Sequence, residues 1–274
     1  MPKATVEQQS QNLTRLLAGL QGHCPSDAGA KADAERLATR LPLAHSLAFG
    51  KLADSLRDGE LRSQQLLGRP AGRAESAMET TDDVFLYVGA FTYPDTECGF
   101  LFVPSLEGDH QAEGVATPFD SGALAFKVDP PEGCPDGVSC VRDHELPLVG
   151  HRRVLARVMT GYLPSPSSYL LHSFDLHGPK KYACHCGHPM PHPFGLRGGD
   201  DRVSTFEVRI PQRVALQAPH LRAVFVREGL EIPELSELFA IGIPIVRFPS
   251  EDGADFFHAL RESCISFIAE HLVA

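Results

Sequence analysis

The sequence predicts a single α+β domain over residues 1–274, and three patterns lead to this fold class. Residues 1–40 carry apolar positions at helical spacing, broken by HCPSDAGA, which predicts a helical N-terminal segment. From about residue 83, short β-type apolar runs alternate with clusters rich in proline, glycine and aspartate. The last stretch, DGADFFHALRESCISFIAEHL, places apolar side chains along one face of an amphipathic closing helix. A strand-rich middle bounded by helices predicts strands packed beneath helices.

The expected elements follow one another clearly through the middle of the chain. The runs DVFLYVGAF, CGFLFVPSL and GALAFKVD predict strands, while HRRVLARVMTGYL and SPSSYLLHSF predict helical segments, the second capped by Ser165 or Ser167. Residues 180–202 have no apolar period and are dense in glycine, proline and histidine, so we expect a long flexible loop beside the functional site. After this loop, STFEVRIPQRVAL, LRAVFV and IPIVRF predict strands, with a helix over IPELSELFAIG.

Composition restricts the classes of protein that fit. The chain is 43% hydrophobic and can bury a sizeable core, but no apolar run approaches the length of a transmembrane helix. The N-terminal stretch lacks the apolar core of a signal peptide, and seven irregularly spaced cysteines do not form a disulfide framework, so we expect a cytoplasmic protein. The net charge of -10 gives no general attraction to nucleic-acid phosphates, although a local basic groove is compatible with it.

The expected loop carries a cluster of zinc-binding residue types: Cys184, His185, Cys186, His188 and His192. Structural zinc sites usually pair their cysteines as C-x2-C or with slightly wider spacing, and a second pair follows. Here the spacing is C-x-C and no second pair follows. The cluster leaves two interpretations open, solvated histidines of a substrate loop and a metal-dependent enzyme.

Several common catalytic signatures do not occur in the sequence. The H-x-E and P-C-x-x-C pair of zinc deaminases is absent, as are G-x-S-x-G and the phosphate-binding G-x-x-x-x-G-K-[ST]. No cysteine lies in a recognisable nucleophile turn. These absences argue against the common hydrolase and nucleotide-hydrolysing classes.

Three short segments resemble, in order, motifs of one enzyme family. LAHSLAFGKLADSLRDGELRS contains a strand that ends in His45 and a small polar residue, followed by a helix that ends at Gly59. DDVFLYVGAF resembles a second strand, and TFEVRIPQRVALQAPHLRAVFV resembles a closing strand that carries Glu207, with a short proline-containing loop after it. This order is similar to that of the ADP-ribosyltransferase-fold superfamily, in particular its DarT-like nucleic-acid-modifying branch, over roughly residues 43–248.

The resemblance implies a split, strongly bent β-sheet with an NAD cleft, and it implies roles for individual residues. Glu207 is the expected catalytic residue, because a carboxylate beside the nicotinamide ribose stabilises the oxocarbenium-like charge and can activate the incoming nucleophile. His45 is expected to bind the adenosine-side ribose, with Ser46 adding a hydroxyl. Taken alone, Glu207 also fits a solvent-facing position on its strand, and His45 fits a core or rim histidine.

The other expected NAD contacts are less closely tied to a motif. Gly59 belongs to the helix motif, and Tyr87 is the expected stacking tyrosine, with Tyr93 and Tyr169 also eligible. Asp120 and Ser121 lie in a segment that suits either a tight turn or a loop contacting phosphate or ribose. Arg202 can pair with the diphosphate or with neighbouring aspartates.

The resemblance thus implies an NAD-dependent ADP-ribosyltransferase of toxin or defence type, as found in toxin–antitoxin or phage-defence systems, with NAD as substrate. The acceptor is a nucleic-acid base or a protein side chain, and an antitoxin or regulator is an expected partner, whereas a membrane is not. The alternative is a catalytically silent module that keeps the fold and binds a nucleotide or another protein.

Overall fold

The computed structural model describes residues 3–21, 27–93, 96–122, 136–171, 205–249 and 256–273. The expected loop at residues 180–202, with its cysteine and histidine cluster and Arg202, lies outside these ranges. Of the strand expected over GALAFKVD, only Gly122 is described, and it is helical together with Ser121 rather than extended.

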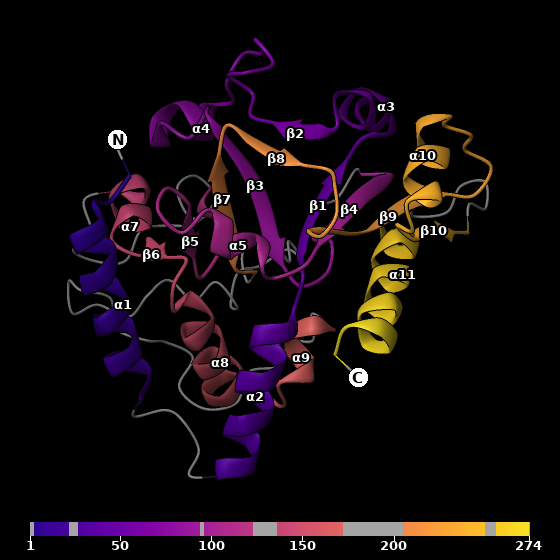
Figure 1. The fold of residues 1–274 in the computed structure, drawn as a ribbon. Helices are drawn as coiled ribbons and strands as arrows, with labels where there is room; N and C mark the ends of the chain where they lie inside the picture. The colour runs from indigo at the N-terminus through magenta and orange to yellow at the C-terminus, as the bar shows by residue number, and fades with distance from the viewer. Residues whose placement is uncertain are drawn as a thin grey trace.

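The fold is α+β and is built around one open sheet of eight strands (Figure 1). Neighbouring strands are antiparallel except β9 and β10, which run parallel with helix α10 (Glu234–Ala240) between them in the chain. Their order across the sheet is β10 (Ile245–Phe248), β9 (Leu221–Arg227), β4 (Cys98–Phe102), β1 (Leu43–Leu47), β3 (Asp83–Val88), β7 (Glu207–Pro211), β5 (Val115–Thr117) and β6 (Leu146–Pro147).

A second, two-stranded sheet lies beside the first. It pairs β2 (Glu60–Arg62) with β8 (Arg213–Ala215), and helices α3 (Phe49–Asp58) and α4 (Arg73–Met78) flank it at the top of Figure 1. Gln212 connects β7 to β8 with a φ of 64°, in the left-handed region, and its N–H donates to the Asp82 carbonyl over 2.6 Å. This tight turn carries the chain from the strand of Glu207 directly into the small sheet.

Helices cover the large sheet on both of its flanks. Figure 1 shows α1 (Val6–Gln21), α2 (Ala28–Arg40) and α8 (His151–Tyr162) together at one end and α11 (Phe256–His271) against β9 and β10. Further short helices are α5 (Leu106–Asp109), α7 (Gly137–Arg142) and α9 (Ser167–Leu170). The expected N-terminal, middle and C-terminal helices therefore coincide with observed ones, and the buried apolar residues form one contiguous cluster.

Helix α9 begins differently from the expectation. Its N-cap is Pro166, without a side-chain capping bond, whereas Ser165 or Ser167 was the expected cap. The Ser165 hydroxyl instead lies 2.9 Å from that of Ser167 and 3.0 Å from that of Ser168. The hydroxyls bond to one another, so they leave the first N–H groups of the helix to other partners.

Strands β1 and β3 pair over only two positions, Leu43 with Val88 and Ala44 with Tyr87. On its other side, β1 pairs with β4 over all five residues. The large sheet therefore opens between β1 and β3 just beyond Ala44, which leaves His45 at the start of the opening.

A buried arginine joins the helices beneath the sheet. Arg152 on α8 donates to the Glu107 carboxylate, at 2.6 Å for its shortest contact, and to the backbone carbonyls of Ala38 and Leu41. These carbonyls belong to the end of α2, where helical partners are lacking.

Within the ranges given above, no helix has both the length and the apolar character that crossing a membrane requires.

Candidate functional site

A cavity of about 600 Å³ lies where β1 and β3 separate. Its walls come from the end of β1, helix α3, the segment from β2 through α4, and the facing sides of β3 and β7. His45 and Glu207, which are far apart in the sequence, both line this cavity, as do Ser46, Tyr87 and Asp120. The volume falls within the range of small-molecule sites, and polar groups converge on it from several elements.

His45 is half-buried and bonds to the edge of the neighbouring strand. Its Nδ1 lies 2.8 Å from the backbone carbonyl of Phe85 on β3, where ladder pairing with β1 has ceased. Because a carbonyl can only accept, Nδ1 must carry the proton, and in the neutral ring Nε2 is then an acceptor. Burial lowers the pKa of His45 despite the Phe85 bond, and the charge of Lys51 lowers it further. The imidazole is therefore neutral at pH 7 and can accept a hydroxyl hydrogen bond.

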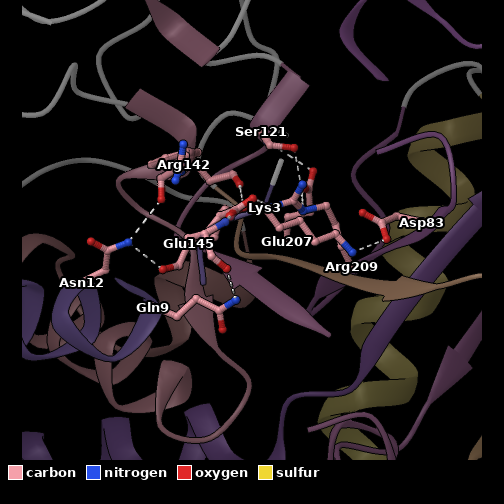
Figure 2. Close-up of polar contacts among 12 residues, drawn as sticks. Lys3, Gln9, Asn12, Asp83, Ser121, Arg142, Glu145, Glu207 and Arg209 are labelled. Carbon is pink, nitrogen blue, oxygen red and sulfur yellow. Dashed lines mark hydrogen bonds and ion pairs between the residues drawn. The ribbon is translucent and has the colours of Figure 1, made fainter. Parts of the chain in front are cut away.

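Glu207 is buried at the first position of β7, with 1% of its surface exposed. Across the ladders it faces Tyr87 on β3 and Thr117 on β5. Ser121 donates to its carboxyl group twice, from the hydroxyl over 2.6 Å and from the backbone N–H over 3.2 Å (Figure 2). The solvent-facing position that the strand pattern also allowed is wrong, because the strands and the segment after β5 enclose the carboxyl group.

The surroundings of Glu207 favour its protonated form. Burial and, after it, the charge of Asp120 raise its pKa to about 8, against the opposing effects of Arg209 and Ser121. A carboxyl group that titrates near neutral pH suits general acid or base chemistry, and a cation bound beside it would promote its ionisation. The site can therefore respond to the charge of its ligand.

Asp120 and Tyr87 form a buried pair in the same wall. The Tyr87 hydroxyl donates to Asp120 over 2.8 Å, and burial together with the Asp120 and Glu207 charges raises the pKa of Tyr87 well above its ordinary value. The ring of Tyr93 lies 6.1 Å from that of Tyr87, centroid to centroid, and also lines the cavity. Tyr169 is elsewhere: its hydroxyl donates to the Val88 carbonyl and accepts from the Phe206 N–H. Two of the three eligible tyrosines thus lie at the site.

The remaining expected residues fall into three groups. Ser121 does not line the cavity itself, but its hydroxyl donates to Glu207, which does. Gly59, itself a described residue, does not line the cavity although Asp58 and Glu60 do; it ends α3 at a φ of 70°, which glycine adopts without strain. Arg202 lies outside the described residues, and so does the cysteine and histidine cluster. Within the described ranges, no group of three or more His, Cys, Asp or Glu residues is arranged to hold a metal.

The cavity rim contains charged residues that sequence reasoning did not single out. Lys51, Arg62, Arg69 and Arg73 supply positive charge, and Asp54, Asp58, Glu60 and Glu75 supply negative charge. Some of this charge is paired within the rim: Arg62 lies 2.6 Å from Glu60 and 3.2 Å from Asp58. These residues lie on a polar helix face and in a turn, and ordinary solvent-exposed surfaces have the same composition. The sequence therefore did not mark them as functional residues.

A scan against models of known protein families gives no match to this chain, and a search of curated proteins gives none.

Proposed function

We propose that this protein is an NAD-dependent ADP-ribosyltransferase that transfers ADP-ribose to a nucleic-acid base or a protein side chain. The observation that carries the proposal is the convergence of His45 and Glu207 on one cavity at the opening between β1 and β3. The motifs that resemble the ADP-ribosyltransferase fold assign these two residues to opposite ends of the dinucleotide. The resemblance also implies a split sheet that carries the NAD cleft, and the opening between β1 and β3 supports the proposal in this respect.

In the proposed complex, His45 accepts a hydrogen bond from the adenosine-side ribose through Nε2, since Nδ1 is committed to Phe85. Arg69 and Arg73 at the rim supply positive charge for the diphosphate. Tyr87 and Tyr93 provide aromatic surface for the nicotinamide ring.

The nicotinamide of NAD carries a positive charge, and this charge favours the ionised form of Glu207 on binding. The carboxylate then stabilises the positive charge that develops on the ribose as its bond to nicotinamide breaks. The acceptor nucleophile forms the new bond to the same ribose carbon and loses its proton to Glu207, while nicotinamide leaves as a neutral molecule. The reaction is a substitution and needs no further reactant.

The decisive experiment incubates the protein with NAD labelled in the adenosine half, together with separate pools of DNA, RNA and protein. We expect label in one pool, matched by release of nicotinamide, and loss of both with Glu207→Gln. Glu237→Gln is the matched control, because Glu237 is exposed on α10 and does not line the cavity. Absence of nicotinamide release with every pool would refute the proposal.

A second candidate is a nucleotide-binding module without chemistry. It is favoured by the raised pKa of Glu207, because a carboxyl that stays protonated when a ligand binds can donate a hydrogen bond but cannot stabilise a developing cation. Calorimetry of NAD binding, combined with an assay of nicotinamide release, separates the two candidates. Binding of NAD without release of nicotinamide over hours would support the silent module.

A further inference from the structure

A buried group of charges lies directly behind Glu207. Arg209 follows Glu207 by two residues on β7, so both side chains leave the strand on one face. Its Nε lies 3.4 Å from a Glu207 carboxyl oxygen, and its Nη2 donates to Glu145. Figure 2 shows the three side chains in one cluster, and each is nearly inaccessible to solvent. A single guanidinium is therefore shared between two buried carboxyl groups.

Glu145 is also fixed by hydrogen bonds to its second carboxyl oxygen and to its backbone carbonyl. Its Oε2 accepts a hydrogen bond from the Ala4 N–H over 2.5 Å, and its backbone carbonyl accepts one from Asn12 on α1 over 3.0 Å. Gln9 in turn donates to the Ala4 carbonyl over 2.9 Å. The N-terminal segment thus holds Glu145 in place, and Arg209 does not have to supply its only contact.

Titratable groups on β3 and in the segment after β5 also act on this cluster. Tyr87 on β3 and Asp120 after β5 face Glu207, and Asp83 on β3 acts on Arg209 while pairing with Lys3 over 2.5 Å. Burial alone would lower the pKa of Arg209, but Glu145 first, and then Glu207 and Asp83, outweigh it. Glu145 is accordingly the stronger partner of Arg209, and the interaction of Arg209 with Glu207 is the weaker one.

We propose that Arg209 is a positioning residue for Glu207, and that Glu145 sets how much of the Arg209 charge Glu207 receives. The two residues act on Glu207 with opposite sign. Removing the arginine charge disfavours the ionised carboxylate, whereas neutralising Glu145 leaves the arginine charge to Glu207 alone. The catalytic consequence rests on the proposed function, but the coupling itself is a property of the ligand-free protein.

The test follows the ionisation of Glu207 by infrared spectroscopy in the absence of NAD. The protonated carboxyl band of Glu207 is assigned as the difference between the wild-type protein and Glu207→Gln, and is titrated with pH. We expect Glu145→Gln to lower the pKa of Glu207, and Arg209→Met to raise it, each by roughly one unit. Glu145→Gln keeps the shape and the oxygen that accepts from Ala4 N–H, and Glu237→Gln is again the exposed control.

Shifts in the same direction in both variants, or shifts below about 0.3 unit, would overturn the proposal. If Arg209→Met fails to fold, Arg209→Lys replaces it: the shorter cation cannot contact both carboxyl groups, so we expect a smaller rise in the pKa of Glu207. A protein that releases no nicotinamide but shows the opposed shifts would refute the proposed function and leave this coupling standing. If nicotinamide release does occur, the acid limb of its pH–rate profile should move in the same two directions.

Discussion

Ser121 donates two hydrogen bonds to Glu207, one from its hydroxyl over 2.6 Å and one from its backbone N–H over 3.2 Å. Both bonds favour the ionised carboxylate and oppose the effect of burial on its pKa. Asp120, the residue just before Ser121, accepts from Tyr87. One short segment after β5 therefore connects the candidate catalytic carboxyl to the candidate stacking tyrosine.

Ser121→Ala removes only the hydroxyl bond, because the backbone N–H remains. We expect the pKa of Glu207 to rise further, so that nicotinamide release at neutral pH falls about tenfold and recovers in part at higher pH. The measurement is the pH–rate profile, with Ser236→Ala on the exposed side of α10 as control. A uniform loss at all pH values would instead point to a structural role of Ser121.

The burial of Glu207 also leads to a prediction about the stability of the fold. Its pKa is about 8 in the fold against 4.5 for the free side chain, so the folded state binds the proton more tightly between these values. The folded state is therefore favoured at low pH and loses stability as the pH rises from 4.5 through about 8. Glu207→Gln removes this effect, and we expect it to be more stable than the wild type by on the order of 1–3 kcal/mol at about pH 9, with little difference at acid pH.

Denaturant unfolding at several pH values checks this prediction. The wild-type and Glu207→Gln curves should diverge as the pH rises, while Glu237→Gln should follow the wild type throughout. Equal unfolding free energies of the two proteins at alkaline pH would show that ionisation of Glu207 does not destabilise the folded state. The same variant loses activity in the proposed function, so it is expected to trade function for stability.

Periodicity predicted most helices and strands because their signals are local. Alternation over STFEVRI and helical spacing near both termini need only a few neighbouring residues. Periodicity could not predict how deeply each strand of the sheet is buried. The alternation places Glu207 and Arg209 on one face of a strand, but their contacts Ser121 and Glu145 are distant from them in sequence. Glu207, for which the sequence also allowed a solvent-facing position, is therefore 1% exposed, and so is Arg209.

The site was accessible to sequence analysis only in part. His45, Tyr87 and Glu207 were predicted as site residues through a resemblance of short motifs, since no periodicity relates residues on strands that meet only after folding. Their common cavity depends on where β1 and β3 stop pairing, which is a property of the whole sheet. Glu145 follows a helix end and gave no signal, because an isolated glutamate there is usually solvated.

Arg152 supports the fold rather than the site. Burial would raise the pKa of Glu107, but His151 and Arg152 outweigh this and lower it to about 2. Stability from this pairing is therefore present above 4.5 and lost as the pH falls towards 2. Arg152→Met leaves Glu107 and two helix-end carbonyls without these bonds, and we expect a loss of about 3–5 kcal/mol at neutral pH.

The matched control is Arg153→Met, since Arg153 is the next residue on α8 and is exposed. Its unfolding free energy should stay within about 0.5 kcal/mol of the wild type. The destabilisation by Arg152→Met should shrink on acidification, because protonation of Glu107 removes the same interaction from the wild type. A destabilisation that is independent of pH would mean that the bonds to the α2 carbonyls, rather than the ion pair, carry the effect.

His45 and Glu207 should fail in different ways if they hold opposite ends of NAD. His45 is neutral and bonded to Phe85, so it can position a ribose but has no charge to stabilise a transition state. We expect His45→Ala to raise KM at least tenfold with a smaller change in kcat, and Glu207→Gln to lower kcat by roughly 10²-fold or more with KM little changed. Steady-state nicotinamide release measures both parameters. His258→Ala, which removes an exposed histidine on α11, should change neither. Loss of kcat alone in His45→Ala would assign this histidine to the reacting end of the cavity, and the dinucleotide would then have to bind in the opposite direction.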